Sequence, residues 1–288
     1  MDANQFQAGV DRLAQPVLPL VRLVEILFLT GPFATVAEVV AELNEPIDTV
    51  VRYEDPAKAL LPYLDVLEEF QRLKDPSTSR YSILDSEGNA LSVMEEVDLW
   101  VAQQVVTREL ESINSQLCAP CRCSLCCIGP SPDLQQVFFS IPLATAETDF
   151  FPLPRIDSVE SRQQTAESDQ PLTVAGRPFY DQGPCLIHWQ SGWSMILPTG
   201  ARCPQLTTSQ GCAVYLQRPE VCRRPQIFPY LIERLPGSPE AHGGIQVFRQ
   251  RGAILAVWDC PYVKRFQAEI ALYAERCELE PVFKENKA

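Results

Sequence analysis

The chain has 288 residues, 46% of them hydrophobic and 21% charged, which is enough to bury the core of one large domain or two small ones and excludes intrinsic disorder. Lys and Arg number 24 against 37 Asp and Glu, a formal net charge of -13. This balance argues against nonspecific binding to nucleic acid, because cationic contacts with phosphates dominate that affinity. The two histidines, His188 and His242, exclude chemistry that needs several imidazoles.

The N-terminal residues lack the pattern of a signal peptide. The most apolar stretch, residues 17–29, is too short and too often interrupted by charge to span a bilayer. We therefore expect a cytoplasmic protein with no membrane partner. Cysteine is frequent, at 11 residues, and clustered cysteines in a reducing cytosol are more often metal ligands than disulfides.

The composition divides the chain in two near residues 112–115. All 11 cysteines lie at or after Cys118. Residues 1–112 carry 8 Lys and Arg against 20 Asp and Glu, whereas residues 113–288 are nearly neutral, with 16 against 17. We therefore predict an acidic first domain over residues 1–112 and a cysteine-cluster domain over residues 113–288.

The predicted elements of the first domain are helices with one hairpin. In chain order they are a helix around residues 20–27, a helix over 36–43 that Thr35 can cap, a third helix from Asp48 or Thr49, a longer helix over 60–73, and a hairpin of strands 80–84 and 90–93. This order resembles a repressor-type winged helix-turn-helix. A DNA-reading third helix would present basic or amide side chains, whereas this one offers Asp48, Arg52, Glu54 and Asp55. We therefore expect the acidic domain to dock another protein rather than nucleic acid.

The second domain is predicted to be rich in loops, with short strands and a C-terminal helix. The strands are expected over 137–141, 185–197, 245–248 and 253–258, and the helix over 262–276. So much loop and proline needs an internal staple, which a metal site bound by cysteines would supply. The predicted fold class is α+β, with a mainly helical winged-helix-like N-terminal domain followed by a metal-stapled cysteine-cluster domain.

The cysteines form two groups that together suggest a metal site. Five thiols lie within the ten residues of the run Cys118-Ala-Pro-Cys121-Arg-Cys123-Ser-Leu-Cys126-Cys127, and a second group is spread over Cys203, Cys212 and Cys222. Zinc takes four ligands, usually from two separate segments, and iron–sulfur clusters take four thiolates. The second group is too widely spaced to close such a site alone, so we expect the two groups to meet in space. A core role fits Cys277, whereas Cys185 is left open between core and ligand.

Four segments carry a resemblance to a known family. Cys123-x2-Cys126-Cys127, Cys203-Pro-x-Leu, Gly211-Cys212-Ala-Val-Tyr215 and Arg218-Pro-Glu-x-Cys222-Arg together resemble the YkgJ-like cysteine-cluster proteins, which are described as zinc- or iron-chelating. The resemblance covers about residues 118–262, and one branch of the family resembles flagellin lysine methylases. The family's first cysteine would fall at Pro120, so the resemblance implies Cys121 there, with Cys118 as the substitute. The other ligands that it implies are Cys123, Cys126, Cys127, Cys203, Cys212, Cys222 and Cys260.

The arginines near the second group have a physical role of their own. Arg218, Arg223 and Arg224 can offset the negative charge of a thiolate site, and we assign Arg218 and Arg223 to cofactor binding. The neighbouring Cys126 and Cys127 favour an iron–sulfur cluster over Zn²⁺, because adjacent thiols can bind different metal atoms of a cluster but are strained on one zinc ion.

The leading functional hypothesis is an iron–sulfur protein with a redox, maturation or partner-docking role. The alternatives are a structural zinc-binding interaction protein, a metal-dependent group-transfer enzyme of the methyltransferase type, and a metal-sensing transcriptional regulator. The sequence contains no Gly-rich nucleotide loop and no imidazole triad, so it does not decide whether the protein is an enzyme.

Overall fold

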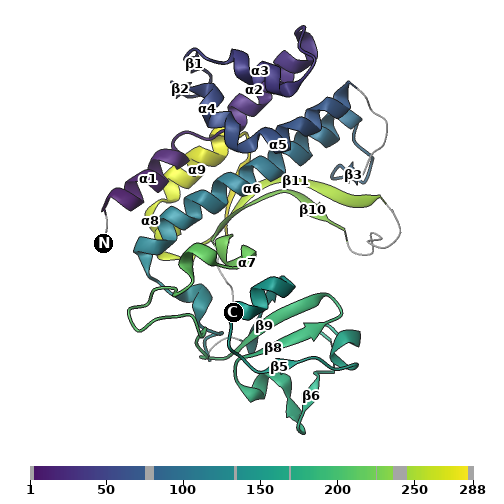
Figure 1. The fold of residues 1–288 in the computed structure, drawn as a ribbon, viewed down its shortest axis with the longest axis vertical. Coiled ribbons are helices and arrows are strands. Elements are labelled where there is room, and N and C mark those ends of the chain that lie inside the picture. Colours follow the sequence, from purple (N-terminus) through teal and green to yellow (C-terminus); the bar gives the residue numbers. More distant parts are fainter. Residues whose placement is uncertain are drawn as a thin grey trace. The chain divides into compact units, whose positions relative to one another are not determined.

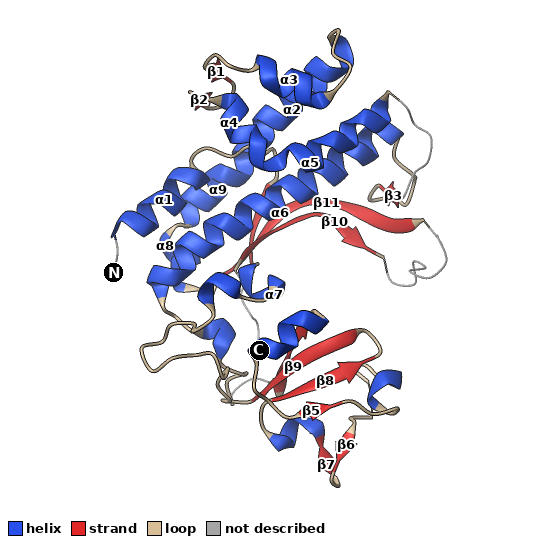
Figure 2. Ribbon diagram, in the orientation of Figure 1, coloured by secondary structure: helices blue, strands red, loops and turns tan. Residues whose placement is uncertain are grey.

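The computed structural model describes residues 3–74, 81–132, 135–168, 170–224, 226–235 and 245–284. It is a mixed α+β structure with several small sheets (Figure 2). The chain forms two compact units, one from residues 1–117 together with 226–285 and the other around residues 118–225. In Figure 1 the second unit is the teal-to-green part that contains β5, β6, β8 and β9.

The first unit combines helices with a four-stranded sheet. Its helices are α1 (Ala3–Leu13), α2 (Leu18–Thr30), α3 (Val36–Glu42), α4 (Pro56–Leu60), α5 (Leu64–Leu67), α6 (Val93–Cys121), α8 (Pro261–Arg265) and α9 (Gln267–Arg276). Its strands are β1 (Ile47–Asp48), β2 (Arg52–Tyr53), β3 (Tyr81–Leu84), β10 (Ile227–Arg234), β11 (Gln246–Val257) and β12 (Glu280–Lys284). β11 pairs antiparallel with β10 and parallel with both β12 and β3, whereas β1 and β2 form a separate hairpin.

No single helix among the described residues is long and apolar enough to cross a membrane. The bent pair Phe6–Leu13 and Leu18–Thr30 meets the requirements of length and composition only when its two helices are counted together.

Polar side chains of the long helix α6 form hydrogen bonds with β10, and Figure 2 shows the helix running along the sheet that contains β10 and β11. β10 contains a β-bulge, where the backbone N–H groups of Leu231 and Ile232 both donate to the Gln103 amide oxygen, at 3.0 and 3.2 Å. Further along the helix, the buried amide of Asn114 donates to the carbonyl of Ile227 at 2.6 Å. The helix thereby satisfies backbone groups that the irregular strand leaves unpaired.

Two of the predicted helices are confirmed, whereas only the first strand of the predicted hairpin forms, because Val93 of the second already begins α6. α2 and α3 follow the expected apolar spacing, and α3 begins with a capping box between Thr35 and Glu38. The Thr35 hydroxyl accepts from the Glu38 N–H at 3.2 Å, and the Glu38 carboxylate accepts from the Thr35 N–H at 3.4 Å. After β3, Leu84 and Ala90 form an isolated antiparallel bridge.

The third helix predicted from Asp48 or Thr49 is wrong, because residues 47–53 form the β1–β2 hairpin. The Thr49 N–H donates to the carbonyl of Val51 at 2.9 Å and closes the turn. Three consecutive β-branched residues, Thr49 to Val51, also lower the helix propensity of the segment. The element that would enter a DNA groove in a winged helix is therefore not a helix here.

The predicted division into residues 1–112 and 113–288 differs from the structure in two ways. The predicted boundary lies inside α6, and the units separate after Leu117. In addition, residues 226–285 return to the first unit, where they supply three strands of its sheet and two helices. Composition changes along the chain, whereas a sheet joins strands far apart in sequence, so composition alone could not reveal this return.

The C-terminal elements confirm one prediction and correct another. The two strands predicted around residues 249–252 are the single strand β11, in which Gly252 adopts a φ of 68° that suits glycine. The predicted helix over 262–276 is divided at Phe266 into α8 and α9. The helical spacing of Val263, Phe266, Ile270 and Tyr273 in the sequence predicts one apolar face for this helix, and all four residues are buried.

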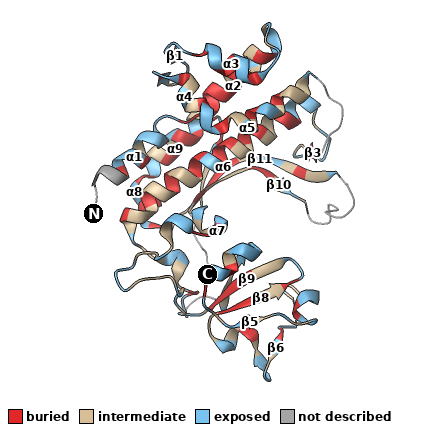
Figure 3. Cartoon of the chain, viewed as in Figure 1, coloured by how far each residue is buried: buried red, intermediate tan, exposed pale blue. Residues whose placement is uncertain are grey.

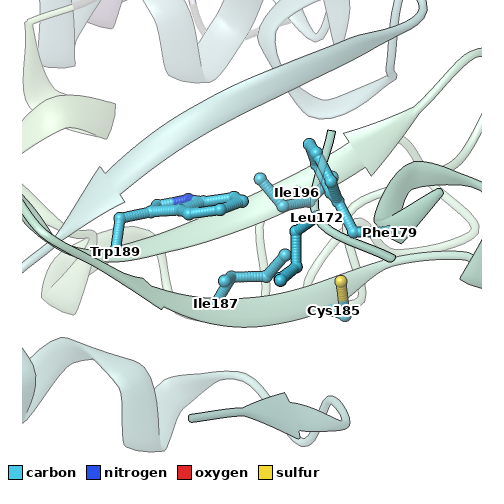
Figure 4. Packing of buried hydrophobic residues seen from close by; sticks show 6 residues of the cluster. All are labelled: Leu172, Phe179, Cys185, Ile187, Trp189 and Ile196. Atoms are coloured by element: carbon cyan, nitrogen blue, oxygen red, sulfur yellow. The ribbon is translucent and has the colours of Figure 1, made fainter. Parts of the chain in front are cut away.

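The second unit is built on a four-stranded sheet with the order β4-β9-β8-β5. Its strands are β4 (Phe138–Leu143), β5 (Arg155–Ile156), β8 (Cys185–Trp189) and β9 (Gly192–Pro198), with the hairpin β6 (Thr173–Val174) and β7 (Arg177–Pro178) and the helix α7 (Glu220–Arg223) beside them. Side chains alternate between the faces of a strand, so each face has its own core. Figure 4 shows the first core, in which Trp189 packs near Ile187 and Ile196. The second core contains Leu186, Met195 and Phe151.

Candidate metal centre

The first cysteine run begins in the last turn of α6 and ends in a short 3-10 helix, η3 (Leu125–Cys127). Between them, Arg122 and Ser124 adopt left-handed backbone conformations, with φ of 52° and 55°. Such conformations cost non-glycine residues about 1–3 kcal/mol and concentrate at functional sites. The turn places Cys126 beside Cys127, with their Sγ atoms 3.9 Å apart.

Backbone pairing joins the second cysteine group to the first. Ile128 and Arg202 form an antiparallel bridge, and the Cys203 N–H donates to the carbonyl of Cys127 at 2.8 Å. These residues come from segments separated by 75 residues of chain. The prediction that the two groups meet in space is therefore confirmed.

Gly129 permits this close pairing. A Cβ atom at this position would lie 1.9 Å from the carbonyl oxygen of Pro198, which is far inside van der Waals contact. The Gly129 N–H also donates to the carbonyl of Ala201 at 2.8 Å. Any larger residue would push the first cysteine run away from the strand that leads to Cys203.

A tight loop then returns the chain from Cys203 to Cys212. Leu206 and Cys212 form an isolated antiparallel bridge at its base. The Thr207 hydroxyl accepts from the Gly211 N–H at 3.0 Å, and the Thr207 N–H donates to the Gly211 carbonyl at 2.8 Å. Cys212 is thus held by backbone hydrogen bonds on both sides of the loop.

The segment after this loop positions Arg218 and Cys222. A 3-10 helix, η7 (Tyr215–Gln217), leads into α7, and the guanidinium of Arg218 lies 3.9 Å from the centroid of the Tyr215 ring. Arg218 is only 8% exposed, which is unusual for a cationic residue. The N–H of Glu220 donates to the Glu147 carboxylate at 2.8 Å and fixes the start of α7, from which Cys222 projects.

These elements enclose a cavity of about 240 Å³. Seven thiols line it: Cys118, Cys123, Cys126, Cys127, Cys203, Cys212 and Cys222. Apolar side chains also line it, including Ile141 of β4, Met195 of β9 and Phe151 from the second core. Among the described residues, no Asp, Glu or His side chain lines the cavity.

Burial is the main influence on the thiols of the cavity. It raises the pKa of Cys118 and of Cys222 to about 12, and repulsion by the Cys126 thiolate adds to the effect. The contact between Cys126 and Cys127 lowers the pKa of Cys126 and raises that of Cys127. The positive charge of Arg218 lowers the pKa of Cys118, Cys126 and Cys222. Several thiolates can therefore coexist here only beside a further cation, such as a metal.

The donor set fits a sulfur-preferring metal. In the described part of the chain, no three Cys, His, Asp or Glu side chains already stand in a metal-binding arrangement. The seven thiols that face the cavity are nevertheless the ligand type that zinc and iron–sulfur clusters use, whereas Mg²⁺ and Ca²⁺ require oxygen ligands. The thiols also exceed the four that a single zinc ion or one cluster needs.

The structure brings together most of the predicted site residues. Six predicted ligands line the cavity: Cys123, Cys126, Cys127, Cys203, Cys212 and Cys222. Within the described residues, Cys118 lines it and Cys121 does not, and Arg218 lines it whereas Arg223 does not. Cys260 belongs to the first unit, where it is fully buried directly before α8.

Other residues were assigned differently or missed. Cys277 is fully buried, as its core role predicted, and Cys185 packs in the core beside Trp189. Sequence reasoning missed Arg122 and Gln210, which line the cavity with positive φ angles. No motif marks either residue, since a left-handed conformation at a non-glycine residue leaves no signal in the sequence.

No protein-family model matches the chain, and no curated protein or solved structure is significantly similar to it.

Proposed function

We propose that residues 118–225 hold an iron–sulfur cluster and that the protein has a redox, maturation or partner-docking role. The observation that supports this proposal is the convergence of seven thiols on one cavity without any carboxylate or imidazole among the described residues. The ligands would come from Cys118, Cys123, Cys126 and Cys127 in the first run and from Cys203, Cys212 and Cys222 in the second. A cluster bound there supplies reversible electron transfer.

The chain's own residues would tune such a site in two ways. Arg218 places a buried positive charge beside the thiols and so offsets part of the negative charge of a thiolate-bound cluster. The apolar side chains of Ile141, Phe151 and Met195 that line the cavity would limit the contact of such a cluster with water. Charge and solvent exposure are two of the properties that set the potential of a cluster.

The cysteine motifs are the basis of the resemblance to the YkgJ-like proteins, and we propose Cys118 rather than Cys121 as the first ligand because Cys118 lines the cavity. A structural zinc site remains the main alternative, because the same thiols would serve it. The adjacent Cys126 and Cys127 favour a cluster with several metal atoms. Within the described residues, no comparable observation favours group transfer. Metal-dependent transcriptional regulation is not favoured either, because residues 47–53 form a hairpin in place of a DNA-reading helix.

Metal and sulfide analysis of anaerobically purified protein tests the proposal. We expect a brown protein that absorbs at about 400 nm through thiolate-to-iron charge transfer. It should contain comparable amounts of iron and inorganic sulfide. A colourless protein that contains zinc would contradict the cluster proposal and would indicate a structural zinc site instead.

Two variants localise the metal. Cys126→Ser removes a thiol that lines the cavity, and we expect it to lose most of the iron and the visible absorption. Cys185→Ala is the matched control, because Cys185 packs in the core beside Trp189 and does not line the cavity. Equal iron content in both variants would place the metal elsewhere.

A further inference from the structure

Helices α2 and α6 of the first unit run antiparallel and in contact. The N–H of the residue that precedes α2 donates to the Glu109 carboxylate of α6 at 3.1 Å. Later in α2, the carboxyl group of Glu25 interacts with that of Asp98, which lies earlier in α6. Continued by one turn along each helix, the same antiparallel order leads to Leu29 of α2 and Met94 of α6.

This end of the helix pair is apolar and open to solvent. Ile26, Leu29 and Met94 are 57%, 38% and 55% exposed. Isolated exposed apolar residues are ordinary on protein surfaces. Three exposed apolar side chains at the same end of two neighbouring helices are more typical of an interaction site.

These side chains border two carboxyl groups whose neighbouring cation, Arg22, is also engaged by other groups. Glu25 and Asp98 contact each other, and the charge of Glu278 also acts on Asp98. The charged partner opposite them, Arg22, donates to the Glu278 carboxylate and, at 3.1 Å, to the carbonyl of Cys277. Burial, reinforced by Asp98, raises the pKa of Glu25 to about 7, and burial also raises the pKa of Asp98. Near neutral pH the carboxyl pair therefore retains a proton where a cation would fit.

We propose that this docking strip, formed by Ile26, Leu29, Met94, Glu25 and Asp98, binds a basic amphipathic helix of a partner protein. Apolar anchors three or four residues apart on such a helix would cover the apolar side chains, while a Lys or Arg between them would reach the carboxyl pair. The excess of acidic residues, 20 against 8 basic ones over residues 1–112, attracts such a partner from a distance. The same field repels nucleic acid and anionic membranes.

Binding of this helix is linked to a proton. The ammonium or guanidinium group of the partner replaces the proton held by Glu25 and Asp98, so the complex forms with proton release. The affinity should therefore increase as the pH rises from 6 to 8, because the carboxyl pair loses its proton over this range. The other charged groups that act on the pair are Arg22 and Glu278.

Fluorescence anisotropy of the full chain with a labelled Leu/Lys helical peptide of about 14 residues tests the proposal. We expect saturable binding that is about tenfold weaker in the double variant Glu25→Gln/Asp98→Asn, which also loses the pH dependence. The matched control Glu42→Gln/Glu45→Gln makes the same change in net charge at exposed residues outside the strip, and it should bind like the unmodified protein.

A second pair of variants tests the apolar part of the strip. Met94→Ser should weaken binding about tenfold, whereas Val159→Ser, at a 70% exposed residue of the second unit, should leave it unchanged. The proposal is overturned if both charge variants weaken binding equally, or if a scrambled peptide of the same composition binds as well. Stronger binding to a DNA duplex or to anionic vesicles than to the peptide would also overturn it.

Discussion

The backbone N–H of Cys203 donates a 2.8 Å hydrogen bond to the carbonyl oxygen of Cys127. This bond, together with the bridge between Ile128 and Arg202, aligns the two cysteine groups through the main chain. The position of the thiols therefore depends on the backbone around them more than on contacts between their side chains. A change that separates the two segments should disrupt the site without altering any cysteine.

Gly129→Ala is the sharpest such change. The added Cβ would lie 1.9 Å from the carbonyl oxygen of Pro198, so one of the two segments must move. We expect lower metal content and a loss of about 1–3 kcal/mol in the free energy of unfolding of the second unit. Metal analysis and thermal unfolding measure both effects. Gly211→Ala is the matched control, because its Cβ would come no closer than 3.4 Å to the Thr207 hydroxyl. If Gly211→Ala lowered metal content and stability as much as Gly129→Ala, the predicted role of Gly129 would be wrong.

Arg218→Met should weaken metal binding while keeping much of the buried volume. Arg218 is the cation that favours the thiolates of Cys118, Cys126 and Cys222. Removal of such a supporting group typically lowers metal affinity by about 10–100-fold. If the metal is an iron–sulfur cluster, the reduction potential should also fall, because the reduced cluster is the more negative form. Arg224→Met serves as the control, since Arg224 forms an exposed ion pair with Glu220, and chelator competition compares the two variants.

Removal of the metal should unfold the second unit and leave the first unit folded. We expect a strong chelator to make residues 118–224 sensitive to limited proteolysis, because that part of the chain depends on the proposed metal to join its loops. Residues 226–235 and 245–284 should stay protected, since they complete the sheet of the first unit. Mass spectrometry of the fragments identifies the cleavage sites. Cleavage throughout the C-terminal 60 residues would show that the first unit also needs the metal.

The buried Glu109 should make the first unit less stable as the pH rises. Its carboxylate accepts from the backbone N–H of Val17 at 3.1 Å and from the Tyr273 hydroxyl at 2.6 Å, and burial raises its pKa from 4.5 to about 7. The folded state therefore holds the proton more tightly than the unfolded state. This stabilisation is complete below about pH 4.5 and is lost as the pH rises through 7, a change of about 3 kcal/mol.

Glu109→Gln isolates this contribution. The amide oxygen can still accept from Val17, and the side chain cannot ionise, so the decline between pH 4.5 and 8 should be smaller than in the unmodified protein. Urea unfolding at a series of pH values gives the comparison. Glu42→Gln, at an exposed position, should leave the profile unchanged. Parallel profiles for the unmodified protein and Glu109→Gln would show that Glu109 keeps an ordinary pKa.

The sequence predicted local structure well where one physical signal dominated. The apolar spacing of α2 and the Thr35–Glu38 capping box of α3 act within a few residues, so both helices could be read directly. The helix predicted from Asp48 is wrong because the apolar residues of this segment match helical spacing only roughly. The backbone N–H of Thr49 instead donates to the carbonyl of Val51 and closes a hairpin. A short hydrogen-bonded turn overrode a weak periodic pattern.

The sequence predicted most of the cysteine ligands of the candidate site, but it did not predict the apolar residues that line the cavity. Cysteine motifs identified six of the thiols that line the cavity, since few other roles explain close-set thiols in a reduced protein. The choice between Cys118 and Cys121 depends on how α6 ends around Pro120, which spacing does not determine. The apolar side chains of Ile141 and Met195 come from paired strands whose register is a long-range property.

In the sequence, the second unit is inserted between α6 and β10, and this order has a consequence for synthesis on the ribosome. Chains emerge from the N-terminus, so residues 118–225 are complete before β10, β11 and β12 have been made. Until then, β3 lacks its partner β11, and α6 lacks the strand whose N–H groups bind Gln103. The second unit can thus fold while the nascent first unit still exposes apolar surface, and during that delay the first unit is the part of the chain that is open to aggregation.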